Sequence, residues 1–303
     1  MNIEKKKTKN RMTREEKIGV AILLAPAIIH LLIFWLGVQI ETIGMAFTKP
    51  DTGQFTLDNF IWSIKELFLG ASASDMGLAF KNTMTFFVVA LCRVPIGIFF
   101  AYLIFRKSFG HTFMRLGLYL PGAISGIMMA MLYTKIMASD GPVIALVQKL
   151  TGTSGTYMFM VEHPMLYIII FDTLVGIGGN LVIWLGSMGR IPNDLIEYGK
   201  LEGIGPLREF VSVVLPLIWP TFVTMISMQI IGIFGASGAV MLLTNGQYGT
   251  DTLAFWMYRV AKDGIASQYH VVSAAGLIFT FLTIPILIVC RKIMNRFGEE
   301  VEY

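Results

Sequence analysis

Charged residues are scarce in this chain of 303 residues, at 15% against about 25% in a typical soluble domain. Long apolar runs take their place, since 55% of the residues are hydrophobic and the mean hydropathy is +0.67. There are two cysteines, Cys92 and Cys290, and both fall in or at the end of apolar runs. We expect them to be small buried hydrophobic residues with no disulfide. This composition excludes an ordinary soluble domain.

The motifs of catalysis and metal binding are also missing. No G-x-x-x-x-G-K-[ST] run is present, so the chain has no phosphate-binding loop for ATP. The four histidines are scattered without the spacing of metal ligands, and no nucleophile–base constellation is visible. We expect no catalytic residues, no metal and no cofactor in this chain.

The apolar residues form six blocks, each long enough for a membrane-spanning helix of about 20 residues. The blocks do not alternate in the way that barrel strands do, and helices pair their own backbone groups in hydrocarbon. The first block is too long for a signal peptide and lacks a cleavage pattern. The sequence therefore predicts an all-α polytopic membrane protein with six transmembrane helices, at 18–40, 82–105, 112–138, 164–188, 215–243 and 269–290.

Basic residues are distributed unevenly between the two sides of this arrangement. With the N-terminus inside, 16 Lys and Arg lie on the cytoplasmic side and seven on the outer side. The positive-inside rule therefore places both termini in the cytoplasm. The predicted organisation is a basic cytoplasmic tail at 1–17, a transmembrane domain at 18–295 and a cytoplasmic tail at 296–303. We interpret the basic tail as contacting anionic lipid headgroups rather than nucleic acid.

A polar stretch at 191–216, IPNDLIEYGKLEGIGPLREFVSVVLP, interrupts the apolar blocks on the cytoplasmic side. Pro192 suits the start of a helix, Asn193 or Asp194 can cap it, and Gly203 and Gly205 permit a sharp turn before Pro206 restarts a helix. A helix this short is unstable alone in water. It must pack either on its own protein or on a partner.

This stretch resembles the EAA loop of ABC-importer permeases. Counting from Glu197, the Glu202-Gly203 pair, Phe210 and Leu215-Pro216 are in register, and Ile191-Pro192 also matches. Tyr198 and Gly199 replace two alanines, and Glu202 replaces an aspartate. The resemblance assigns contact with an ATPase to the first turns of the loop, at Glu197, Tyr198, Gly199, Glu202, Gly203 and Ile204.

The resemblance extends over most of the chain and is to the carbohydrate-uptake branch, which includes the maltose permeases. The supporting segments are LLAPAIIHLLIFWLGVQIETIGMAF (23–47), LDNF (57–60), KNTMTFF (81–87), RLGLYLPGAISG (115–126), LLTNG (242–246) and TLAFWMYRVA (252–261). It implies the type I ABC importer permease fold in a bacterial inner membrane. It also implies a sugar substrate and, as partners, a second permease, two ATPase subunits that hold ATP and Mg²⁺, and an extracellular solute-binding protein.

Two ionisable residues lie deep inside predicted spans, Arg93 in the second and Asp172 in the fourth. Such residues usually face a partner or a cavity. Their depths are similar, about 16 and 12 Å below the outer ends of their helices at about 1.5 Å per residue. They either form a buried ion pair or line a substrate cavity, where a carboxylate accepts hydrogen bonds from sugar hydroxyls.

The resemblance favours Asp172 as a sugar contact. It places neighbouring contacts at Val175, Gly176 and Gly179, and further ones on the fifth helix at Gln229, Gly232, Ile233 and Ala236. The glycines 176–179 equally suit close helix packing. Two other functions remain open: an ABC permease for a polyol phosphate or another non-sugar solute, for which Arg93 would suit an anion, and a membrane enzyme or ion-coupled carrier.

Overall fold

The computed structural model describes residues 13–69, 76–151, 159–236, 238–262 and 266–296, and these are nearly all helical. The predicted all-α class is confirmed. The first half comprises α1 (Arg14–His30), a π-helical turn (Leu31–Gly37), α2 (Val38–Ala46), α3 (Asp58–Leu69), α4 (Met76–Phe105), α5 (His111–Ala123), α6 (Gly126–Ile136), α7 (Pro142–Thr151) and α8 (Phe159–Glu162). The second half comprises α9 (Pro164–Met188), α10 (Asn193–Leu201), α11 (Pro206–Glu209), a π-helical turn (Phe210–Val214), α12 (Leu215–Leu217), α13 (Trp219–Ile231), a 3-10 turn (Ile233–Gly235), α14 (Gly238–Leu243), a 3-10 turn (Gln247–Gly249), α15 (Leu253–Lys262) and α16 (Ala266–Met294). The two predicted tails lie largely outside the described residues.

Four of the six predicted spans are single helices, and two are broken. Lys17–Ala46, α4, α9 and Gln268–Met294 are each long and apolar enough to cross a membrane. The pairs α5–α6 and Pro206–Leu217 with Trp219–Ile231 pass the same test only together, bent by 112° and 73°. With each bent pair counted as one span, the described residues hold six candidate spans, as predicted. Pro220 lies in the first turn of α13, directly after the bend at Ile218, where its missing N–H costs no helical hydrogen bond, and Pro121 lies inside α5 shortly before the other bend.

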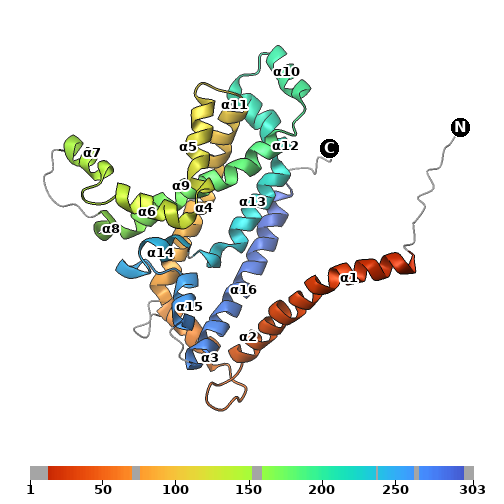
Figure 1. The fold of residues 1–303 in the computed structure, drawn as a ribbon, viewed down its shortest axis with the longest axis vertical. Coiled ribbons are helices and arrows are strands. Elements are labelled where there is room, and N and C mark those ends of the chain that lie inside the picture. The colour runs from red at the N-terminus through yellow and green to blue at the C-terminus, as the bar shows by residue number, and fades with distance from the viewer. Residues whose placement is uncertain (1–12, 70–75, 152–158, 237, 263–265, 297–303) are drawn as a thin grey trace.

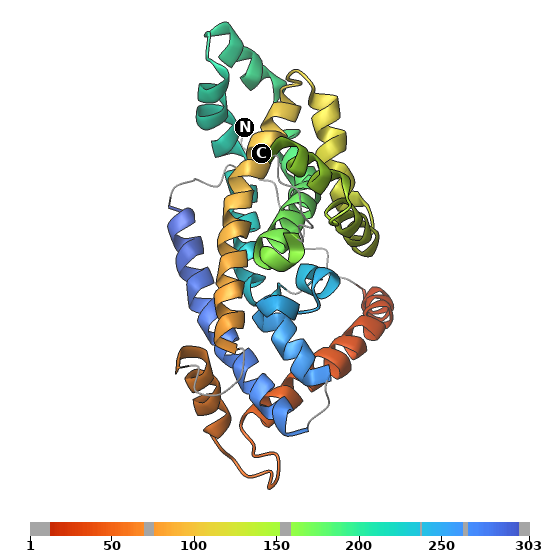
Figure 2. The same ribbon diagram turned by 90° about the vertical axis from the view of Figure 1, so that its left-hand side faces the viewer.

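The order of contacts along α4 and α9 shows that these two helices run in the same direction. Phe86 packs with Phe171 in one cluster, and further along both helices Ile98 packs with Trp184 in another. α4 and α9 are therefore parallel, so the bent α5–α6 pair between them crosses back. Figures 1 and 2 show the result, with α10 and α11 at one end of the bundle and α2 and α3 at the other.

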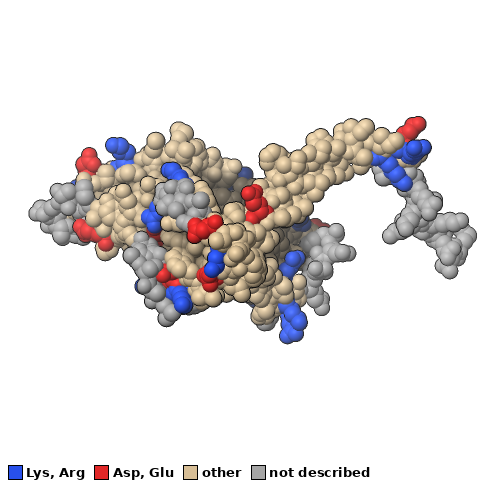
Figure 3. Space-filling model, turned by 90° about the horizontal axis from the view of Figure 1, so that it is seen from below, with Lys and Arg blue, Asp and Glu red and all other residues tan. Residues whose placement is uncertain are grey.

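The first span leaves the bundle as an arm (Figure 1). None of the most apolar part of Lys17–Ala46 is buried within the chain. Figure 3 shows an uncharged surface along the middle of this arm, which agrees with the absence of charged residues between Lys17 and Glu41. Only its far end is attached: His270 Nδ1 lies 2.8 Å from the carbonyl oxygens of Met45 and Thr48. Lipid or another chain must cover the rest.

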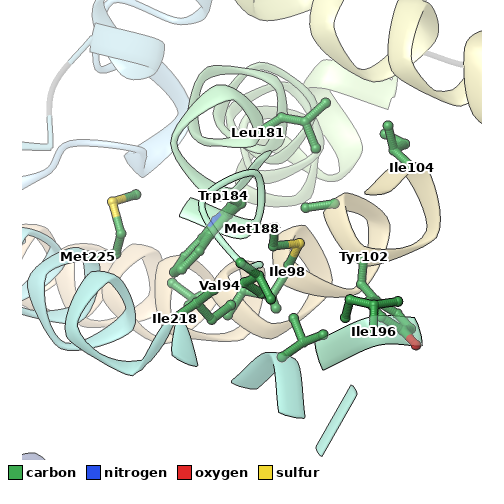
Figure 4. Packing of buried hydrophobic residues seen from close by; sticks show 13 residues of the cluster. Val94, Ile98, Tyr102, Ile104, Leu181, Trp184, Met188, Ile196, Ile218 and Met225 are labelled. Atoms are coloured by element: carbon green, nitrogen blue, oxygen red, sulfur yellow. The ribbon is translucent and has the colours of Figure 1, made fainter. Parts of the chain in front are cut away.

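The main apolar core lies where α4, α9 and the segments after α10 meet (Figure 4). Trp184 is almost fully buried and rests against Gly97, where an added Cβ would lie 3.6 Å from its Nε1. Ile196 of α10 belongs to the same core. The expectation of buried cysteines fails, since Cys92 is exposed and Cys290 is half-buried. Both lie on outward faces of spans, which turn apolar side chains toward lipid rather than inward.

Glycines bring α5 and α9 into close contact. A Cβ added to Gly178 would overlap the Leu118 carbonyl oxygen, and one added to Gly122 would lie 2.7 Å from the Gly179 nitrogen. Because these neighbours are backbone atoms, they cannot move aside without separating the helices. This part of the glycine run therefore serves helix packing.

We expect Gly178→Ala to destabilise the folded chain by about 1–3 kcal/mol, the usual cost of overpacking. Gly186→Ala on the same helix is the matched control, because no atom lies within 4 Å of its added Cβ. Thermal unfolding of the two purified variants in detergent checks this. Equal midpoints would contradict the close α5–α9 contact.

Candidate functional site

Arg93 of α4 and Asp172 of α9 form an ion pair within the span region. Arg93 Nη1 donates to Asp172 Oδ2 and to the Asp172 backbone oxygen, both at 2.7 Å. The arginine side chain is 10% exposed and the aspartate 35%. The ion-pair interpretation is thus confirmed, but the carboxylate remains partly open. Among the described residues no hydrogen-bond partner reaches Arg93 Nε.

The same two residues also line a pocket of about 220 Å³. Six of the nine residues predicted to contact substrate surround it: Arg93, Asp172, Gln229, Gly232, Ile233 and Ala236. The two alternatives for Arg93 and Asp172 are therefore compatible, since the pair forms one wall of the pocket. Arg93 and Asp172 are the ionisable residues of the lining, and their formal charges cancel.

Val175, Gly176 and Gly179 are not in the pocket lining. Gly176 instead makes room for Arg93, because a Cβ there would overlap the guanidinium group. Val175 packs against the apolar cluster around Phe171. Gly179 lies at the close α5–α9 contact described above. None of these three residues therefore lines the pocket: Gly176 contacts Arg93, Val175 packs in the Phe171 cluster, and Gly179 lies at the contact with α5.

Sequence reasoning missed the α4 side of the pocket, formed by Phe86, Phe87 and Ala90. Phe87 is half-buried, so part of its ring is free to contact a solute. The signal was present in the segment KNTMTFF at 81–87. Helical spacing would have placed Phe86 and Ala90 one turn apart, on a face that continues to Arg93.

Irregular backbone forms the opposite wall. α13 ends at Ile231, a 3-10 turn covers Ile233–Gly235, and Ala236 is extended. Non-helical backbone at membrane depth is tolerated where it lines a cavity or is buried in protein. The predicted span 215–243 is thus interrupted a second time, beyond the bend at Ile218, and this second break lines the pocket.

At the far end of the bundle, α10 stands out as a short helix with a well-defined end. Gly203 adopts φ +71, the Ile204 N–H donates to the Gly199 oxygen and the Gly203 N–H to the Lys200 oxygen. This is a Schellman C-cap, with Ile204 Cδ1 3.9 Å from where a Gly199 Cβ would lie. The predicted turn at Gly203 is confirmed. The predicted side-chain cap is wrong: Pro192 is the N-cap and no side chain bonds the helix start.

α10 is amphipathic with respect to its own protein. Ile196 and Gly199 are buried, while Glu197, Lys200 and Glu202 are exposed. Several large apolar side chains are also exposed here: Leu195 at 41%, Tyr198 at 66%, Leu201 at 82% and Leu207 at 76%. One face of the loop therefore packs on its own chain, and the other is left exposed.

Comparison with known proteins identifies the class. Residues 93–301 match the family described as binding-protein-dependent transport system inner membrane component. The chain belongs to this family. The match covers the α10 loop and the pocket residues from Arg93 onward, while Phe86, Phe87 and Ala90 lie before it.

Similar proteins span nearly the whole chain. A probable starch degradation products transport system permease protein of Thermoanaerobacterium thermosulfurigenes is 25% identical, over 93% of this chain and 94% of its own. An sn-glycerol-3-phosphate transport system permease protein of Escherichia coli is also 25% identical, over 88% and 91%. A crystal structure of a bacterial alginate ABC transporter superposes with a TM-score of 0.79 at 21% identity, over 94% and 96%. The predicted type I importer fold is confirmed.

Proposed function

We propose that this permease imports a neutral oligosaccharide, and that the pocket around Arg93 and Asp172 holds part of it during passage. The observation that carries the proposal is the cancelled charge of the pocket. A free arginine would attract an anion, but Asp172 Oδ2 lies 2.7 Å from Arg93 Nη1. The remaining polar groups, a partly exposed carboxylate and the Gln229 amide, suit hydroxyl donors and acceptors. The exposed part of Phe87 offers an apolar surface for a sugar ring.

The size of the pocket supports a shared site. At about 220 Å³ it is smaller than the roughly 300–1,000 Å³ of typical ligand sites. A second, homologous permease would supply the other half. It would also cover part of the apolar arm.

The loop containing α10 is the proposed attachment point for an ATPase. Its free apolar face, with Tyr198 and Leu201 prominent, suits a groove on a protein partner better than water. Glu197 and Glu202 add charge at its edge. Two ATPase subunits would hold ATP and Mg²⁺, a solute-binding protein would deliver the sugar outside, and this chain would hydrolyse nothing.

The distribution of charge supports a cytoplasmic position for this loop. Arg190, Lys200, Arg208 and the basic end of α16 lie at the α10 end of the bundle. Both termini would then lie in the cytoplasm by the positive-inside rule. Anionic lipid headgroups are the expected neighbours of the basic tail.

A polyol phosphate is the second candidate substrate, and the relative named for sn-glycerol-3-phosphate transport favours it. Arg93 would then have to release Asp172 in order to bind the phosphate. Uptake tests separate the two candidates. We expect cells that lack this chain to lose uptake of labelled maltotriose and to regain it on re-expression. Recovery of labelled sn-glycerol 3-phosphate uptake instead would favour the polyol phosphate.

A further inference from the structure

A buried acidic residue, Glu209, lies in the second half of the 191–216 loop, at the end of α11. Glu209 is 1% exposed, although it is a charged residue in a cytoplasmic segment. Its neighbours come from the end of α4 and the turn that follows it: Tyr102 Oη lies 2.9 Å from Glu209 Oε1, and Arg106 Nε, directly after α4, lies 3.6 Å from the same oxygen. We call Tyr102, Arg106 and Glu209 the Glu209 latch. It fastens the end of the loop to the helix that carries Arg93.

The hydrogen bonds within the latch are incomplete. The Tyr102 hydroxyl has one proton but faces two acceptors, Glu209 Oε1 and the Pro206 carbonyl oxygen at 2.7 Å. It can donate to one of them at a time. The Arg106 distance of 3.6 Å is an ion pair but too long for a hydrogen bond. Glu209 Oε2 is buried and has no hydrogen-bond partner among the described residues.

A buried oxygen without a donor calls for a physical reason. Movement of the loop toward or away from α4 would let Arg106 reach both carboxylate oxygens, or would release the Pro206 carbonyl. Such a movement would give the latch two discrete arrangements that differ in which donors serve the carboxylate. Elements with two arrangements are what carry coupling between distant sites.

α4, which carries Tyr102 of the latch, also carries Arg93 of the pocket. Tyr102 and Arg93 are both on α4, nine residues apart, or about 13 Å along the axis. Tyr102 packs against Phe210, with ring centroids 4.9 Å apart, and shares the main core with Val94 and Ile98. A shift of the loop therefore acts on the same packed helix that holds the Arg93–Asp172 pair.

We infer that the Glu209 latch transmits movement of the ATPase-bound loop to α4 and so to the pocket. The inference rests on the proposed function, because it requires an ATPase on the loop. Glu209, Tyr102 and Arg106 are positioning residues: they touch neither nucleotide nor solute. Their role is to make α4 respond to the state of the loop.

The native Cys92 allows a direct test, because it is exposed and adjacent to Arg93. A fluorescent maleimide is attached to Cys92 in a Cys290→Ser background, within the complex purified from the membrane. Emission is compared with and without ATP plus vanadate. We expect a nucleotide-dependent change in the parent, and a change smaller by about fivefold or more in Tyr102→Phe and Glu209→Gln. The amount of ATPase that stays bound to the chain is measured on the same samples.

Tyr133→Phe is the matched control, since it removes a buried hydroxyl that donates to the Tyr167 oxygen at 2.8 Å, away from the latch. It should keep the full response. If Glu209→Gln fails to assemble, Tyr102→Phe decides, because it removes one oxygen and leaves the packing intact. A full fluorescence response in Tyr102→Phe would overturn the inference and leave the proposed function standing. The same holds if the complex without a latch substitution retains its ATPase but shows no response. A parent that retains no ATPase overturns the proposed function and the inference with it.

Discussion

Replacement of Gly203 by valine is expected to lower ATP-driven uptake by about tenfold or more, while the chain still inserts into the membrane. Gly203 adopts φ +71 at the C-cap of α10. A β-branched residue is a clear outlier in that conformation, and the left-handed region costs about 1–2 kcal/mol even for ordinary residues. The hydrogen bonds from the Gly203 and Ile204 N–H groups would be lost. α10 would then present Tyr198 and Leu201 in the wrong direction.

Gly205→Ala is the matched control for this prediction. Gly205 has φ −69, which alanine adopts freely, and no atom lies within 4 Å of an added Cβ. Uptake by cells expressing each variant, normalised to the amount of chain in the membrane, gives the comparison. Normal uptake by Gly203→Val would show that the shape of the loop does not matter for transport.

Replacement of Gly176 by alanine is expected to reduce uptake by about tenfold, even though the change is a single methyl group in a helix interior. The added Cβ would overlap the Arg93 guanidinium. Since that group ends a flexible side chain, it should move rather than push α4 and α9 apart. Arg93 would then lose Asp172, and breaking a buried ion pair costs about 3–5 kcal/mol when one charge is left unpaired. The formal charges of the pocket would still cancel, but Arg93 and Asp172 would no longer be paired.

Gly179→Ala tests whether this effect is specific. It places the same methyl group three residues further along α9, where nothing lies within 4 Å of the new Cβ. We expect near-normal uptake from it. If both variants transport equally well, the Arg93–Asp172 pair is not needed for passage of the solute.

Much of the architecture could be predicted because it depends on long apolar runs and the distribution of basic residues. The number of spans and the Gly203 turn followed directly from the sequence. The breaks in the third and fifth spans did not, because apolar composition is the same for straight and bent helices. The bend of 112° between Ala123 and Gly126 is a property of the backbone that a hydropathy profile does not contain.

The residues of the pocket, too, could be predicted from the sequence only in part. Arg93 and Asp172 stand out in the sequence because ionisable residues are rare in spans. Gly176 does not, since a glycine gives no sign of which side chain occupies the space beside it. The mid-span break at Gly232–Ala236 would also suit an ion-coupled carrier. The match to a binding-protein-dependent family over 93–301 distinguishes the two classes.

The central claim is that the exposed face of α10 binds an ATPase and that a second permease completes the pocket. Gentle detergent extraction, affinity capture of this chain and mass spectrometry of the captured proteins test it most directly. We predict recovery of an ATPase that carries a phosphate-binding loop, together with a second permease with several apolar spans. The ATPase should be lost from Gly203→Val and kept by Gly205→Ala. Recovery of the chain alone under several detergents would contradict the account.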